Sequence, residues 1–323
     1  MTSIDLSIII PSHQRSDLLQ TCLDSVCRFA PQRSEIIVVD DASPNRSAEA
    51  VARAAGVRYL RLRRRHGFCA AANEGIKIAR GSIVELLNDD AEVTVTWSDA
   101  PLAAFRDSSV GAVAPLVLMA GRSGLGQRID SAGDCYYWGG VACKRWHGKD
   151  PNDCVLGRRP VFGASACAAF YRRDVVLALG AFPSHFEAYF EDVDLAFRLH
   201  RAGYNVLFEP ASIVFHHVSA SYALRTRQLL QQQASNEERV FWRNMPGAAL
   251  PQALPRHVAV LAAKAWRRWQ EGTLAPFICG RLRVLKEAWD IRDHRRRQFR
   301  QHGAADITRW QVDKSYQRAT SRS

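Results

Sequence analysis

Apolar runs alternate with amphipathic stretches over the first third of the chain. Continuous runs rich in Ile, Val and Leu are typical of strands buried on both faces of a parallel sheet, and they occur at residues 6–10, 35–39, 57–62 and 82–87. The stretches between them predict helices at residues 16–26, with Ser16 as N-cap, and at residues 47–55 and 69–79. This order of strands and helices predicts right-handed βαβ units and therefore an α/β fold.

Polar residues stand directly after three of these four strands. Pro11-Ser12-His13 follows the first, Asp40-Asp41 the second and Asn88-Asp89-Asp90 the fourth. Ligands of open α/β sheets bind beyond the carboxyl ends of the strands. Paired carboxylates there are oxygen ligands for a hard divalent cation, Mg²⁺ or Mn²⁺, which would bridge to a diphosphate. No G-x-G-x-x-G sequence follows the first strand, which argues against a dinucleotide-binding Rossmann domain.

The next part of the chain has a less regular pattern. The middle segment, roughly residues 110–165, begins with an apolar strand at 110–117 and becomes rich in glycine and aromatic residues at 133–140. Beyond that strand it is interpreted as an irregular surface insertion. A helix is expected at residues 174–180, and further strands are expected at residues 167–171, 204–210 and 213–215.

Three carboxylates fall within four positions of one segment, Glu191-Asp192-Val193-Asp194, ahead of a predicted helix that ends at Gly203. One interpretation is that they cap this helix and favour the positive end of its dipole. The other is catalysis, because a carboxylate among Tyr189 and Phe190 costs free energy unless a cation or a reaction uses it. Capping accounts for one or two of the three, and Asp194 is the one assigned to it.

Two further clusters of basic residues lie near the expected ligand edge. Neighbouring strand residues face opposite sides of a sheet, so only one of His216 and His217 can reach that edge, and an imidazole ligand would favour Mn²⁺. Arg63-Arg64-Arg65 precedes the helix at 69–79. It forms either a solvated turn or a contact between one arginine and a phosphate or nucleobase.

The composition changes near residue 223. The 323 residues carry a net charge of +12, and many of the arginines fall in this tail beside Trp266, Trp269, Trp289 and Trp310. Helices of this composition suit the interfacial plane of an anionic membrane, or they form a helical cap with a solvated basic face. Nucleic-acid binding is not expected, because no recognised binding motif accompanies the charge.

The sequence carries few signals of cellular location or of disulfide and zinc chemistry. The sequence has no basic region followed by an apolar run at its start, and no run of about 18 apolar residues. We therefore expect a cytoplasmic protein, peripheral on the cytoplasmic face of the inner membrane if the tail binds lipid. None of the 8 cysteines forms a C-x-x-C pair, so reduced thiols are expected and a zinc site is not.

Five motifs in this order resemble family 2 glycosyltransferases of the GT-A fold, particularly the bacterial rhamnosyl- and galactofuranosyltransferase-like members. They are I-I-I-P, V-V-D-D-A-S, G-x-x-x-A-A-N-x-G, L-L-N-D-D and F-E-D-V-D-L-x-x-R, and the resemblance spans about residues 4–222. It implies a GT-A domain at residues 1–222, with a mostly parallel sheet flanked by helices. Residues 223–323 are then a helical C-terminal extension.

The resemblance also implies roles for individual residues. Asp192 matches the general base, with Glu191 as its neighbour, and Asp90 matches the metal ligand, with His216 as an additional ligand. One residue of the pair Asp40 and Asp41 matches the contact to the donor nucleobase. The donor site implied in this way contains Pro11, His13, Asp40, Asp41, Arg65, Asn73, Asn88 and Asp89.

The sequence departs from the family pattern at three places. Asn88 replaces the first aspartate of a D-x-D-type motif, and Arg65 stands where many relatives have asparagine. Residues 180–187 differ from the usual G-F-D-E-x-F-F sequence on the acceptor side, which indicates an unusual acceptor.

The function implied is that of an inverting, metal-dependent glycosyltransferase. It would move a sugar from a donor of the dTDP-rhamnose or UDP-sugar type to a hydroxyl of a glycan or lipid-linked acceptor, in cell-surface polysaccharide or lipopolysaccharide biosynthesis. The alternative is a non-catalytic scaffold of the same fold that binds membrane or partner enzymes through its basic tail. A nucleotidyltransferase is disfavoured, since no glycine-rich phosphate loop follows the first strand.

Overall fold

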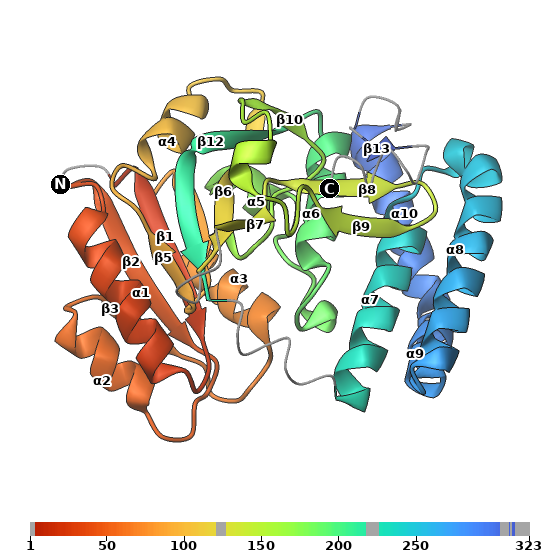
Figure 1. Cartoon of the computed structure of the whole chain (residues 1–323), viewed down its shortest axis with the longest axis horizontal. Helices are drawn as coiled ribbons and strands as arrows, with labels where there is room; N and C mark the ends of the chain where they lie inside the picture. Colours follow the sequence, from red (N-terminus) through yellow and green to blue (C-terminus); the bar gives the residue numbers. More distant parts are fainter. Residues whose placement is uncertain (1–3, 121–126, 218–225, 304–309, 311, 314–323) are drawn as a thin grey trace.

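The computed structural model describes residues 4–120, 127–217, 226–303, 310 and 312–313. A large sheet with its covering helices occupies the left of Figure 1, and the long helices of the C-terminal extension gather at the right. The N-terminal half of the sheet is parallel and has the order β4-β1-β2-β3, with strands β1 (Leu6–Ser12), β2 (Ser34–Asp40), β3 (Arg58–Arg61) and β4 (Ile83–Leu87). The four strands predicted for this half are confirmed.

The other half of the sheet is mixed. Strand β11 (Ala168–Arg172) runs antiparallel between β4 and β6 (Val110–Met119), and β12 (Asn205–His216) pairs in parallel with β6. Short strands complete this half: β5 (Ala91–Val93), β7 (Arg128–Ser131) and β10 (Arg159–Val161). The two strands predicted at 204–210 and 213–215 are one strand, β12, whose pairing with β6 shifts register between Glu209 and Ile213.

Helices cover both faces of the sheet because successive strand residues point to opposite sides. Ile8 and Ile10 pack with α1 (Ser16–Phe29) and α2 (Ser47–Ala54), whereas Ile9 packs on the opposite side. That opposite side is covered by α3 (Phe68–Ile78), α5 (Arg173–Ala178) and α6 (Glu191–Arg201), and the first side also by α4 (Asp99–Ala104). The predicted N-cap at Ser16 is wrong, since Arg15 occupies the cap position and no side chain caps α1.

The glycine- and aromatic-rich stretch forms a second, small sheet. Strands β8 (Asp134–Tyr137) and β9 (Val141–Lys144) make a hairpin, and β13 (Val312–Asp313) adds to β8 in parallel. The side chains of Tyr136 and Trp138 are buried in the core. The prediction of an irregular surface insertion is therefore wrong, because these aromatic residues pack inward against residues that are distant in the sequence.

The extension consists of α7 (Arg227–Asn244), α8 (Leu250–Gln270), α9 (Leu274–Arg283) and α10 (Ala288–His302). Short 3-10 helices complete the fold: η1 (Pro151–Asp153), η2 (Ser184–Phe186), η3 (Gly247–Ala249) and η4 (Val284–Glu287). Helix α7 lies between α6 and α9. The predicted boundary at residues 222–223 lies outside the described residues. Among the described helices, none combines the length and the apolar character needed to cross a bilayer.

Candidate active site

A cavity of about 920 Å³ opens at the carboxyl ends of β1, β2 and β4. The end of β12, the segment before α6, the start of α6 and the first turns of α7 also line it, so distant parts of the chain meet there. The structure brings together in this wall most of the candidate residues of the sequence, namely Pro11, His13, Asp41, Arg65, Asn88, Asp89, Asp90, Glu191, Asp192 and His216.

Two predicted donor residues, Asp40 and Asn73, lie outside this wall. Asp40 is fully buried and accepts hydrogen bonds from the Tyr59 hydroxyl at 2.7 Å and the Ser43 amide at 2.9 Å. The Asn73 amide is paired in both directions with the backbone of Phe182, at 2.7 and 2.9 Å. Their hydrogen bonds hold the fold, so this placement argues against a donor contact by either residue.

Asp41, the other residue of the pair, holds the loop that carries Arg65. Its two carboxylate oxygens accept hydrogen bonds from the backbone amides of His66 and Gly67, both at 2.8 Å. Gly67 has a φ of +86°, and a Cβ atom there would lie 2.8 Å from the carbonyl oxygen of Glu187. Only glycine fits this position without strain. The loop of the arginine run therefore approaches the segment before α6 closely.

Asp89 and Asp90 share a cation that the sequence did not reveal as part of the site. The Arg15 guanidinium lies 2.9 Å from Asp90 and 3.5 Å from Asp89. Burial raises the pKa of Asp89 to about 6 against the opposing charge of Arg15. Burial also opposes ionisation of Asp90, but the hydrogen bond and charge of His216 outweigh it and lower the pKa of Asp90. The only sequence signal for Arg15 was its place just beyond β1.

His216 stands between two carboxylates. Its Nε2 atom lies 3.1 Å from Asp90 Oδ1, and its Nδ1 atom lies 2.9 Å from Oδ2 of Asp130. Burial works against the charged imidazole, but the neighbouring Cys167 and the hydrogen bonds to Asp130 and Asp90 raise the pKa of His216 to about 12. His217 points the other way and contacts Glu92, which agrees with the expected alternation along the strand.

This arrangement fits a divalent cation. Two ligand atoms at about 2.1 Å from an octahedral ion, at right angles to each other, are about 3 Å apart, close to the separation of Asp90 Oδ1 and His216 Nε2. Histidine ligands of metals usually donate their other ring N–H to a carboxylate, which is the position of Asp130 here. The ligand atoms of Asp130, Cys167 and His216 also all lie within 4.8 Å of one another. Asp90, Cys167 and His216 line the cavity, whereas Asp130 is fully buried. We favour Asp90 and His216 as ligands because a carboxylate and an imidazole suit Mn²⁺ better than a thiolate does, and we take Asp130 as the residue that orients His216.

Asp192 lies at the first turn of α6 with part of its side chain open to the cavity. Its Oδ2 accepts a hydrogen bond from the Ala166 amide at 3.1 Å, and its Oδ1 accepts one from the Val193 amide at 2.8 Å. Burial raises the pKa of this carboxyl, while the two amides act in the opposite direction. A carboxylate that is held by two amides and has a raised pKa is a stronger base than an ordinary aspartate.

Glu191 is more deeply buried than its neighbour. Its Oε2 atom has no hydrogen-bond partner among the described residues, although the residue borders the cavity. Burial, together with the nearby charge of Asp192, raises its pKa well above the ordinary value. Burial therefore favours the neutral form of Glu191 more than that of an ordinary glutamate, and in that form the side chain can donate a hydrogen bond into the cavity.

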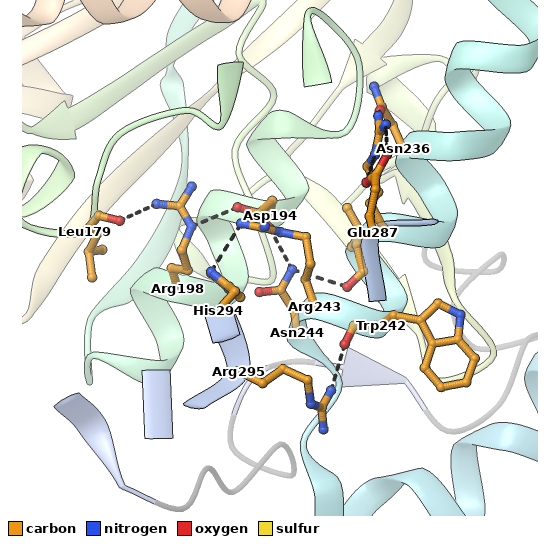
Figure 2. Close-up of polar contacts among 12 residues, drawn as sticks. Leu179, Asp194, Arg198, Asn236, Trp242, Arg243, Asn244, Glu287, His294 and Arg295 are labelled. Atoms are coloured by element: carbon orange, nitrogen blue, oxygen red, sulfur yellow. Dashed lines mark hydrogen bonds and ion pairs between the residues drawn. The ribbon is translucent and has the colours of Figure 1, made fainter. Parts of the chain in front are cut away.

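Asp194 has a different role from the predicted helix cap. It is fully buried and accepts hydrogen bonds from Arg198 at 2.8 Å, Arg243 at 3.0 Å and Asn244 at 2.8 Å (Figure 2). Burial opposes its charge, but the two guanidinium groups outweigh this effect and lower its pKa. Arg243 and Asn244 belong to α7, so the capping prediction is wrong and Asp194 ties α6 to the extension.

A second cavity of about 460 Å³ adjoins the first at Asp192. The two share Lys144, Ser165, Tyr189, Phe190, Asp192 and Leu229. Its far wall comes from the extension and carries Lys264, Arg267, Arg268 and Arg281. Asp134 of β8 also lines it, and burial together with the charge of Asp192 raises the pKa of Asp134 well above its ordinary value. No sequence pattern marked Asp130, Asp134 or Lys144 as part of the site, because they lie in the middle segment interpreted as a surface insertion.

The chain has relatives in several organisms. It is 32% identical over 231 residues to the protein y4gI of Sinorhizobium fredii, a match that covers 67% of this chain and 25% of that protein. It is 27% identical over 227 residues to the O-antigen biosynthesis protein RfbC of Myxococcus xanthus, covering 67% of this chain and 17% of the relative. The glycosyltransferase AglE of Haloferax volcanii is 26% identical over 303 residues, which cover 89% of this chain and 92% of AglE. The chain thus spans about a quarter or less of the length of the first two relatives.

Solved structures support the fold. The crystal structure of GalNAc-T7 with UDP, GalNAc and Mn²⁺ superposes with a TM-score of 0.56 at 18% identity, covering 78% of this chain and 51% of that one. The mannosyltransferase PcManGT of Pyrobaculum calidifontis, in complex with GDP-Man and Mn²⁺, superposes with a TM-score of 0.53 at 18% identity, covering 90% of this chain and 88% of that one. The predicted α/β fold of the GT-A type is therefore confirmed.

A sequence profile for Glycosyl transferase family 2 matches residues 7–180, more than half of the chain. That range contains nearly all of β1 to β4 and the aspartates at their ends. The chain belongs to glycosyl transferase family 2.

Proposed function

We propose that this protein is an inverting glycosyltransferase that uses a nucleotide-diphosphate sugar, with a divalent cation, to glycosylate a hydroxyl group of a glycan or lipid-linked acceptor. The observation that carries the proposal is the meeting of Asp41, Asp90, His216 and Asp192 around one cavity in a chain of this family. The O-antigen relative supports a role in cell-surface polysaccharide synthesis. The donor would be of the dTDP-rhamnose or UDP-sugar type.

Asp192 acts as the base in the proposed reaction. The acceptor hydroxyl gives its proton to the Asp192 carboxylate as its oxygen bonds to the anomeric carbon. The bond from that carbon to the diphosphate oxygen breaks on the opposite face, and the diphosphate leaves with the electron pair. The amides of Ala166 and Val193 hold the Asp192 carboxylate in place during this step. Attack from the face opposite the leaving group inverts the anomeric carbon, and positioned proton transfer contributes about 10²–10⁴-fold.

The donor diphosphate would lie beside Asp89, Asp90 and Arg15. A divalent cation on Asp90 and His216 supplies neutralisation of the leaving group when it is bound. Support comes from the 3.1 Å spacing of the two ligand atoms and from Mn²⁺ in both similar solved structures. Mn²⁺ suits an imidazole ligand better than Mg²⁺ does. The Arg15 guanidinium adds a fixed positive charge on the same side.

The acceptor would occupy the second cavity. This cavity reaches Asp192 from the side of the extension, so an acceptor hydroxyl there would meet the base without crossing the donor site. Lys264, Arg267, Arg268 and Arg281 of the extension form its far wall, where each is paired with a glutamate, Glu237, Glu238 or Glu271. The extension would thereby take part in acceptor choice.

The extension would also contact an anionic membrane surface from the cytoplasmic side. Its exposed large apolar side chains include Trp266, Trp269, Leu285, Trp289 and Phe299. Exposed arginines accompany them at positions 292, 296, 297 and 300. Apolar rings among basic groups are the composition of helices that bind at the interface of anionic lipid.

Incubation with a panel of nucleotide sugars tests the central proposal. With Mn²⁺ present, the matching donor should raise the melting temperature, because a ligand that binds only the folded state stabilises it. The same donor should release its nucleoside diphosphate slowly in water and faster with an acceptor, and excess EDTA should stop the release. Neither stabilisation nor turnover by any donor would favour the scaffold alternative.

A further inference from the structure

The segment that leads into the acidic motif has an unusual backbone. Glu187, Tyr189 and Phe190 have φ values of 59°, 72° and 68°. Residues other than glycine rarely adopt positive φ values, and such conformations persist only where the surrounding structure holds them. Three of them within four positions, directly before Glu191 and Asp192, require a specific support.

Two side chains of α7 provide that support. Gln232 Nε2 donates to the carbonyl oxygens of Phe186 at 3.1 Å and Ala188 at 3.5 Å, and Asn236, one turn later, reaches a third carbonyl as well. The Asn236 Nδ2 group on α7 donates to the carbonyl oxygens of Phe186, Ala188 and Tyr189, at 2.8, 2.9 and 3.0 Å. Asn236 is fully buried, so water cannot replace it. The two N–H groups of one amide thus reach three carbonyl groups of the segment, which would otherwise repel one another.

A chain of buried partners fixes the orientation of that amide. The Arg239 guanidinium donates to Asn236 Oδ1 at 2.5 Å and to the carbonyl oxygen of His185 at 3.1 Å. Glu287 holds the same guanidinium through two hydrogen bonds, at 2.6 and 2.8 Å; Asn236 and Glu287 are labelled in Figure 2. Because a guanidinium can only donate, the amide oxygen must face Arg239 and the NH₂ group must face the three carbonyls.

On its other side the segment is held by the donor-site half. The Cys69 amide at the start of α3 donates to the Glu187 carbonyl at 2.9 Å, beside Gly67. The segment therefore lies between α3 and α7, and its last residue, Phe190, is the N-cap of α6. A shift of the segment would move the first turn of α6, which carries Asp192.

We propose that Asn236 is a positioning residue for sugar transfer, which sets the entry of α6 into the cavity and thereby the place of the Asp192 carboxylate. This inference rests on the proposed role of Asp192 as base. It gives the extension a part in the chemistry, in addition to its contact with the acceptor. Arg239 and Glu287 act through Asn236.

The variant Asn236→Asp tests the inference. It keeps the shape of the side chain but turns an acceptor oxygen toward three carbonyls. We expect kcat to fall about 10²-fold, the size of effect known for displacement of a reacting group by about 1 Å. The fall in kcat should exceed any change in the KM for the donor, since the segment also lines the donor cavity at residues 187–190. Amide hydrogen exchange of a peptide spanning residues 184–192 should become faster.

Ser235→Ala is the matched control. Ser235 is the neighbouring buried residue of α7, and its hydroxyl contacts the carbonyls of Gln231 and Gly280, both at 2.9 Å, away from the segment. Its loss should lower stability without changing kcat or the exchange of residues 184–192. If Asn236→Asp does not fold, the smaller and uncharged Asn236→Ser replaces it, with the same expectations.

Two results would overturn the inference. One is an equal fall of kcat in the Ser235 and Asn236 variants, which would mean a general loss of structure. The other is unchanged exchange of residues 184–192 in the Asn236 variant. Hydrogen exchange is measured without substrate, so it shows whether Asn236 holds the segment even if the wild-type protein transfers no sugar. Absence of sugar transfer by the wild-type protein would count against the proposed function itself.

Discussion

The two parts of the chain distribute charged and apolar residues in opposite ways. Residues 1–222 contain 24 basic and 24 acidic residues, whereas residues 223–323 contain 20 basic and 8 acidic ones, so the extension accounts for the whole net charge of +12. In the first part apolar strands are buried and charged groups gather at one cavity. In the extension many large apolar side chains are exposed, while α7 buries a row of polar ones, namely Ser235, Asn236, Glu237, Glu238 and Arg239.

The basic residues of the extension occupy two kinds of position, buried pairs and exposed surface. Arg239 and Arg243 are buried and paired with Glu287 and Asp194, and Arg243 thereby fastens the extension to the first part. Arg267, in contrast, is largely exposed and pairs with Glu271 at the end of its own helix. The buried pairs support the cap interpretation of the tail, and the membrane interpretation stays a proposal that concerns its exposed side chains.

The largest expected effect tests the chemistry of the first part. Asp192→Asn removes the proposed base and should lower kcat/KM by about 10²–10⁴-fold without unfolding the protein. Initial rates of donor turnover with acceptor measure it. Asp99→Asn, at an exposed position of α4, is the control and should keep wild-type activity. Wild-type turnover by the Asp192 variant would rule out the base assignment.

The pH dependence of kcat/KM sharpens the same assignment. Burial raises the pKa of Asp192, and a base must be ionised, so activity should fall about tenfold per pH unit as the pH drops below this raised value. The acidic limb should therefore lie above the ordinary aspartate pKa of about 3.9. Circular dichroism at each pH would separate loss of activity from unfolding. A limb at the ordinary value would show that another group controls the rate.

The junction of the two parts should contribute strongly to stability. Asp194→Asn removes the charge that faces Arg198 and Arg243 and should cost about 3–5 kcal/mol in the free energy of unfolding, since two buried guanidinium groups lose their counter-ion. Urea denaturation measures it. Glu49→Gln weakens the pair with the exposed Arg53 on α2 and should cost below about 1 kcal/mol. Equal losses in both variants would contradict the role of Asp194 as a buried tie.

A smaller effect is expected where a buried carboxylate orients a metal ligand. Asp130→Asn should weaken the apparent affinity for Mn²⁺ about 10–100-fold, because Asp130 holds the Nδ1 side of His216. Titration of activity with Mn²⁺ after EDTA treatment measures it. Asp107→Asn, at a fully exposed carboxylate, serves as control. An unchanged Mn²⁺ dependence would remove Asp130, and with it the His216 site, from the proposal.

The smallest effect concerns the outer face of the extension. Replacing Trp266 and Trp269 together by serine should reduce sedimentation with anionic liposomes about tenfold, and added salt should reduce binding of the wild-type protein. Val155→Ser removes an exposed apolar side chain from the neutral part and should leave binding unchanged. No wild-type binding at low salt would leave only the cap function for this face.

Local patterns predicted the first part well for a physical reason. A strand that is buried on both faces must be apolar along its length, and the polar residues that bind a ligand follow directly after such a strand. The positions of Asp41, Asp90 and Asp192 could therefore be expected from the sequence and the family resemblance. Arg15 and Asp130 could not, because each gains its role from a partner on a distant segment. The buried hairpin of Tyr136 has no local signal that distinguishes it from a loop.

The sequence by itself determined the α/β order, the family and the acidic motif at the start of α6. The resemblance assigned Asp192 to catalysis, and the helix pattern assigned Asp194 to capping. Only the tertiary structure showed which groups surround each of the two carboxylates. Asp192 and Asp194 are two positions apart and chemically alike, but a helix turns them to different sides. One faces the cavity and the other meets Arg243, which lies 49 residues later in the chain. Their surroundings, set by long-range packing, decide which carboxylate is available for chemistry and which holds the fold.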